Sequence, residues 1–75
     1  MRVEKFDHDD TTALRALGFD IADDGESGKL SSVTVDIEII RPDAEWFYLL
    51  NGTVLDTRCF RADLLEAGGI KEEDT

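Results

Sequence analysis

Side chains that build covalent or catalytic sites are scarce in this 75-residue chain, which has one cysteine, one histidine and one proline. A single cysteine, Cys59, excludes an intramolecular disulfide. Nucleophilic catalysis needs a cysteine or serine beside a base and a third, orienting group. His8 lies in an acidic run and Cys59 ends a predicted strand as a small buried apolar residue, so neither has such a setting. We therefore expect a protein that is not an enzyme and has no small-molecule substrate.

Long apolar runs are also missing. The longest, Trp46 to Leu50, is far shorter than the roughly 20 residues that a membrane helix needs. Nothing near the first residue resembles the basic and apolar segment of a signal peptide. Together with the lone cysteine, these features predict a soluble protein in a reducing, cytoplasmic setting that does not contact membranes.

Basic residues are few: eight Lys and Arg stand against 18 Asp and Glu, which leaves a formal net charge of −10. Proteins bind nucleic acids largely by neutralising phosphates with Lys and Arg, so direct binding to nucleic acid is not expected. The charge instead indicates a protein partner with a basic surface.

Metal and cofactor motifs are incomplete. Asp20, Asp24 and Gly25 match the first, fifth and sixth places of an EF-hand loop, but Ala22 and Ser31 occupy the third and twelfth places, where the loop requires ligands. A zinc ligand set, a glycine-rich phosphate loop and a dinucleotide fingerprint are not found. No cofactor and no metal site are expected.

What the chain does contain is enough apolar residues to fold, at 41% of the sequence. That content and the length predict one domain over residues 1–70, followed by a disordered acidic tail at 71–75. Acidic and hydroxyl residues followed by alanine and leucine, with glycine at the end, predict a short helix over 9–18. A second short helix is predicted over 61–67, before two glycines.

Strands are predicted between these helices. Residues 33–40 alternate between β-branched and mostly polar side chains, which is typical of a strand with one buried face. Two further strands, 45–50 and 53–59, flank Asn51-Gly52, a strong signal for a two-residue hairpin turn. The expected fold class is α+β: an antiparallel meander of three or four strands with two short helices packed on one face.

The turn lengths also predict a register, in which Tyr48 pairs with Leu55 and with Ile37. In that register the inner face of the sheet collects Val33, Val35, Ile37, Ile39, Trp46, Tyr48, Leu50 and Leu55. The outer face collects Thr34, Asp36, Glu38, Ile40, Glu45, Phe47, Leu49, Val54, Asp56 and Arg58.

Two functional hypotheses follow from this map. In the first, an array of strand carboxylates imitates nucleic-acid phosphates and lets the protein inhibit a host or defence protein by occupying its basic nucleic-acid-binding surface, as phage anti-restriction and anti-CRISPR proteins do. In the second, the protein is an accessory or assembly subunit that docks through an apolar patch, and its acidity serves only solubility or salt adaptation. The expected partner-binding residues are Asp36, Glu38, Glu45 and Asp56 on the strands, Asp23, Asp24 and Glu26 in a loop, and Phe47 and Leu49, with Val54, in the apolar patch.

Overall fold

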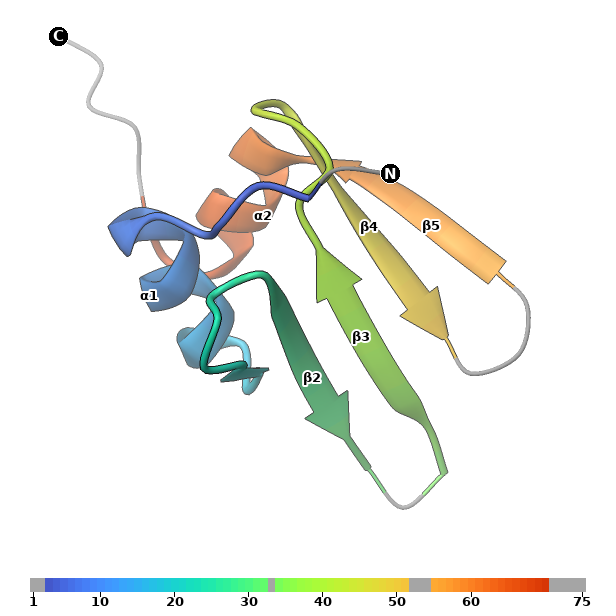
Figure 1. The fold of residues 1–75 in the computed structure, drawn as a ribbon. Helices are drawn as coiled ribbons and strands as arrows, with labels where there is room; N and C mark the ends of the chain where they lie inside the picture. The colour runs from blue at the N-terminus through green and yellow to red at the C-terminus, as the bar shows by residue number, and fades with distance from the viewer. Residues whose placement is uncertain (1–2, 33, 52–54, 71–75) are drawn as a thin grey trace, which may run out of the picture.

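The protein folds as a five-stranded antiparallel sheet with two helices, in a computed structural model that describes residues 3–32, 34–51 and 55–70 (Figure 1). Side chains are described for the same residues except 51, 55 and 56. The predicted tail at 71–75 lies outside the described residues. The elements in chain order are α1 (His8–Ala16), β1 (Asp20–Ile21), β2 (Ser27–Ser31), β3 (Asp36–Ile40), β4 (Trp46–Asn51), β5 (Leu55–Phe60) and α2 (Arg61–Ala67).

The predicted α+β class is confirmed, but the strand count is five rather than three or four. The strands follow one another across the sheet in the order β1-β2-β3-β4-β5. The sequence signal for β1 and β2 is weak, because β1 has only two residues and β2 is mostly polar and contains Gly28. Gly28 faces the core beside β3, where an added Cβ would be 3.2 Å from Cγ2 of Ile39. The glycine therefore allows an apolar neighbour to pack directly against the β2 backbone.

Helix α1 begins and ends on local signals. The Asp7 carboxylate accepts a hydrogen bond from the Asp10 amide, and the Asp10 carboxylate accepts one from the Asp7 amide, which completes a capping box. At the other end Gly18 has a φ of 100°, the left-handed conformation that glycine adopts at little cost. The Phe19 amide then donates to the Leu14 carbonyl at 2.9 Å, so the chain folds back over the helix as the sequence predicts.

The core lies between the helices and one face of the sheet. Phe6 and Phe47 stack with ring centroids 5.8 Å apart. Leu64 of α2 and residues from α1, β1, β2 and β5 complete the packing around them. The buried residues that contact one another in this core are Phe6, Leu14, Phe19, Ile39 and Phe47.

The predicted register is wrong by three residues in both hairpins. Tyr48 pairs with Ile40 and Arg58, not with Ile37 and Leu55. Because side chains alternate between faces, an odd shift exchanges the two faces of β4 relative to β3 and β5. Asn51 pairs with Leu55, so residues 52–54 connect β4 and β5 in place of the two-residue turn. Gly52, which was predicted to lie in that turn, is outside the described residues.

Two features explain the error. Trp46-Phe47-Tyr48-Leu49-Leu50 is apolar at every position, so alternation could not identify its buried face. The connection before β4 is also longer than expected. Glu45 donates its amide to Oδ1 of Asp43 at 2.7 Å, and its carbonyl accepts the Arg61 amide at 2.8 Å. The first bond shapes the turn before β4, and the second continues the β4–β5 pairing by one further position.

Candidate functional site

The face of the sheet opposite the core carries a group of apolar side chains, which we call the open face. Cross-strand partners share a face, and the pairs Trp46 with Phe60 and Ile40 with Tyr48 both lie on this side. Within the described ranges, the helices pack only on the opposite face, and Phe60 is 51% exposed. The apolar residues of the open face are Ile40, Trp46, Tyr48, Leu50 and Phe60.

Contacts between side chains order the aromatic part of the open face. Trp46 and Phe60 stack with centroids 4.4 Å apart and an interplanar angle of 29°. The guanidinium of Arg58 lies over the Tyr48 ring, 5.3 Å from its centroid. Stacking and cation–π contacts restrict rotamers, so these large side chains are held in place before any partner arrives.

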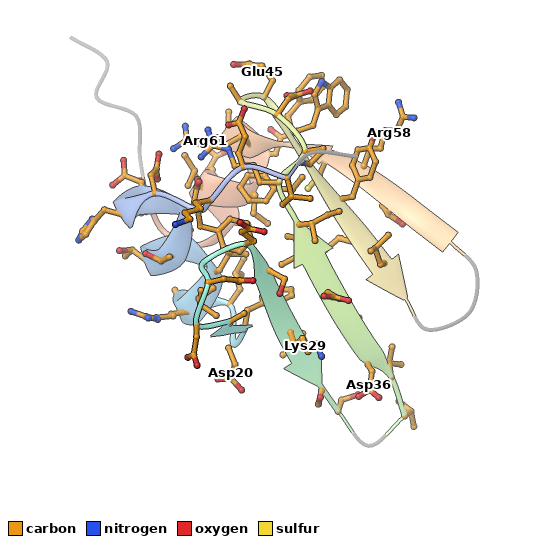
Figure 2. The ribbon with its side chains drawn as sticks, viewed as in Figure 1. Asp20, Lys29, Asp36, Glu45, Arg58 and Arg61 are labelled. Carbon is orange, nitrogen blue, oxygen red and sulfur yellow. The ribbon has the colours of Figure 1, made fainter. Side chains whose placement is uncertain are left out.

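At the end of the sheet nearer the β2–β3 connection, the open face becomes polar. Lys29 pairs across the strands with Glu38, and Glu38 with Leu50. Figure 2 shows Lys29 and Asp36 at this end of the sheet. A hollow of about 470 Å³ lies there, lined by Lys29, Ser31, Asp36, Ile37, Glu38 and Leu50. Its charges are mixed, because Lys29 lines it together with Asp36 and Glu38.

The predicted acidic array is only partly assembled. Asp36 and Glu38 do lie on the open face, on β3. Glu45 precedes β4 and is labelled at the opposite end of the sheet from Asp36 (Figure 2). Asp56 pairs with Leu50 in the backbone ladder, and its side chain lies outside the described ones. Glu45 therefore does not lie beside Asp36 and Glu38.

The loop acids lie near the other edge of the sheet, between β1 and β2. Asp23 and Asp24 are exposed and Glu26 is half-buried. Oδ1 of Asp24 accepts the Glu26 amide at 2.9 Å, so this carboxylate shapes the turn. The structure does not bring these residues beside the open-face aromatics on β4 and β5.

The predicted apolar patch is wrong. Phe47 is fully buried and Leu49 packs against the core, so these two side chains stabilise the fold and Phe47 offers no surface to a partner. Val54 lies outside the described residues. The residues that take their place on the open face are Trp46, Tyr48 and Leu50, which the sequence had assigned to the interior.

A buried ion-pair cluster, which the sequence did not predict, joins three elements. The Asp10 carboxylate is fully buried and is hydrogen-bonded by Nη1 of Arg41 and, at 2.8 Å, by Nε of Arg61. Nη2 of Arg61 also donates to Asp7 at 2.9 Å. The cluster thus ties the start of α1 to the end of β3 and to the start of α2. Nothing in the local sequence identifies the two arginines as partners of the capping box.

The pKa values of this cluster follow from its contacts. Burial raises the pKa of Asp7, but the Asp10 amide and the guanidinium groups of Arg61 and Arg41 outweigh it, and the net pKa is below the ordinary value of 3.8. Burial lowers the pKa of Arg61, but hydrogen bonding and attraction to Asp10 outweigh this, and the net pKa is raised. Both groups are therefore held in their charged forms.

The remaining reactive groups are separate from the open-face aromatics. Burial raises the pKa of the Cys59 thiol, and the nearby charge of Asp63 adds to the rise. The His8 side chain is 93% exposed at the start of α1. Within the part of the chain that the structure describes, no three His, Cys, Asp or Glu residues are grouped closely enough to hold a metal ion. No helix among the described residues has the length and apolarity to cross a membrane.

Comparisons of the chain with family models, with curated proteins and with solved structures found no match.

Proposed function

We propose that this chain is a non-catalytic protein-binding module, an accessory or assembly subunit that docks on a partner protein through its open face. One observation supports this most: Trp46, Tyr48 and Phe60, ordered by their mutual contacts and by Arg58, lie on a sheet face that no described helix covers. Tyr, Trp, Phe and Arg are the residues most enriched at the centres of protein interfaces.

The charge of the molecule favours a partner with a basic rim around an apolar centre. Asp36 borders the open face at one end, and Asp43 and Glu45, both exposed, lie beyond β4 at the other. Opposite charges around an apolar contact increase the association rate and select against acidic partners. We place this interaction in the cytoplasm, in keeping with the lone cysteine.

A second proposal is the inhibitor of the anti-restriction or anti-CRISPR type, which would use phosphate mimicry against a basic nucleic-acid-binding surface. The observation that favours it is the engagement of Arg41 and Arg61 with Asp7 and Asp10. Two of the eight basic residues are thereby directed inward, and the outer surface is left strongly acidic. The incomplete acidic array is the reason that we rank this proposal second.

The docking proposal is tested by capture from a lysate of the source organism, using the full chain as bait. We expect Trp46→Ser with Tyr48→Ser to abolish capture of a partner that the unmodified chain retains. The matched control is Ala22→Ser with Ala62→Ser, two exposed positions away from the open face. If the same protein is captured by all three baits, the open face is not the docking site.

Purified partner allows a direct reading at the site. Trp46 is the only tryptophan, so its emission reports on the open face without labelling. We expect a shift to shorter wavelength on binding, because docking removes water from the indole. Unchanged emission at saturating partner would contradict docking at this face.

Salt separates the two proposals. Between about 0.15 M and 0.5 M salt, phosphate mimicry should weaken steeply as the Debye length shortens, whereas docking through the apolar open face, with opposite charges only at its rim, should weaken much less. Under mimicry, Asp36→Lys with Glu38→Lys should abolish binding. The same charge change at Glu72 and Glu73 is the control for net charge, and equal loss in both double variants would contradict the mimicry proposal.

A further inference from the structure

The two edges of the sheet differ in how well they are protected. An exposed edge strand presents unpaired backbone groups to any other strand, and proteins usually shorten, kink, charge or cover such edges. β1, at one edge, has only two residues and contacts α1. β5, at the other edge, has six residues, and none of the described residues pairs with its outer side (Figure 1).

β5 lacks three of the features that protect an edge strand, namely proline, lysine and a bulge. It contains no proline and no lysine. Its pairing with β4 advances one residue at a time from Asn51 with Leu55 to Trp46 with Phe60, so no bulge bends it away. Its two charged residues, Asp56 and Arg58, have opposite signs and lie two positions apart in the strand.

We propose that the outer edge of β5 is a self-association site, at which a second copy of this chain adds its own β5 in antiparallel orientation. This inference goes beyond the proposed function and does not depend on it. A two-fold axis at Thr57 places position 57 opposite itself, and position 56 of each copy opposite position 58 of the other. Acidic Asp56 then faces basic Arg58 of the partner copy at two places.

Charge selects this register over its neighbours. With the axis moved to position 58, two Arg58 residues face each other, and with the axis at position 56, two Asp56 residues do. Like charges directly opposite in a sheet are unfavourable. If the numbers of two paired residues add up to an odd total, as for 56 with 57, a residue on the core face of one copy lies beside a residue on the open face of the other.

The proposed β5–β5 dimer does not require the other elements of either copy to move. α2 follows the last residue of β5, and antiparallel strands carry their ends in opposite directions. The two α2 helices are therefore separated by about six residues along the strands, roughly 20 Å. The open faces of both copies lie on the same side of a continuous ten-stranded sheet. The open face stays free for the partner proposed above.

Sedimentation equilibrium of the full chain tests the proposal. We expect a reversible monomer–dimer equilibrium that tightens with added salt, because two chains of net charge −10 repel each other. Thr57 is exposed, so Thr57→Lys should fold normally while placing two lysines face to face on the axis. We expect it to weaken the dimer by about tenfold or more. Ser31→Lys, at an exposed position of β2, adds the same charge and should leave the dimer unchanged.

A charge exchange tests the register. Asp56→Arg alone and Arg58→Asp alone should each fail to dimerise, because each places like charges opposite one another. Mixed together, the two variants restore opposite charges at both positions and should form a heterodimer. Circular dichroism of each variant shows whether it has folded, and Thr57→Lys provides an independent reading if either has not. A wild type that stays monomeric near 1 mM at every salt concentration, or single variants that dimerise like it, would overturn the proposal.

Discussion

At the scale of single residues, the buried carboxylate of Asp10 is the most consequential group in the molecule. It has two guanidinium partners, and its burial is complete. A buried charge is tolerated only with such compensation, and the loss of one partner leaves the others uncompensated. Arg41, whose side chain is only 10% exposed, depends on this carboxylate in turn.

We expect Asp10→Asn to lower the free energy of unfolding by about 3–5 kcal/mol, because the Arg41 and Arg61 charges lose their buried counterion. Urea denaturation measures the change. Asp9→Asn is the matched control, one residue earlier with a side chain that is 60% exposed, and it should change stability by less than about 0.5 kcal/mol. Equal effects of the two substitutions would show that the cluster does not stabilise the fold.

Asp7 gives a prediction for pH. Its folded-state pKa lies below the ordinary 3.8, so its ionised form favours the folded state. The stabilisation that it contributes is fully present above pH 3.8 and is lost as pH falls through the lower folded-state pKa. We expect the stability difference between wild type and Asp7→Asn to narrow over that acidic range. Asparagine still caps the helix, so the comparison isolates the charge. A difference that stays constant with pH would contradict this assignment.

At the scale of elements, β4 determines which side chains the sheet buries and which it presents. Its residues are apolar on both sides, but only Phe47 and Leu49 face the helices. Trp46, Tyr48 and Leu50 face outward as a consequence of the ladder with β3 and β5. A local pattern thus established the strand, and pairing with its neighbours decided its orientation.

A pair of phenylalanines tests this orientation. Phe47→Ala should cost about 3–5 kcal/mol of unfolding free energy, because Phe47 is fully buried in the core. Phe60→Ala should cost less than about 1 kcal/mol, because Phe60 is half-exposed and stacks only on Trp46 within the open face. Thermal and urea denaturation of the two variants give the comparison. Similar costs for both would indicate the alternative register.

At the scale of the whole molecule, the net negative charge destabilises the compact folded state. Eighteen acids and eight bases share a chain of 75 residues, and most of the described acidic side chains are exposed. Mutual repulsion among like charges destabilises the compact state and is screened by salt. The same repulsion acts between copies and toward any acidic partner.

We expect the melting temperature of the dilute protein to rise when sodium chloride is raised from about 0.05 M to about 0.5 M, because screening relieves repulsion in the folded state. Measurement at low micromolar concentration keeps self-association from contributing. Glu72→Lys with Glu73→Lys, which reduces the net negative charge, should show a smaller rise. A melting temperature that falls with salt would mean that the internal ion pairs dominate the electrostatics.

The sequence by itself determined the parts of this protein that depend on local chemistry. Capping residues and a terminal glycine located α1, the two glycines after Ala67 located the end of α2, and turn residues located β3, β4 and β5 to within a few residues. It also determined the charge, and with it the expectation of a basic partner. Each of these features is set by neighbours along the chain, so a local pattern is sufficient to reveal it.

Only the tertiary structure decided which face of the sheet is buried. The ladder bonds, the bond between Glu45 and Arg61 and the close approach of Gly28 to Ile39 join residues that are distant in sequence, and no local pattern records them. The Asp10 cluster is decided in the same way, since its arginines lie 31 and 51 residues away. Side chains alternate between the two faces of a strand, and the observed register differs from the predicted one by three residues. Trp46 and Tyr48 therefore lie on the open face and not in the core, which is why the candidate site lies there.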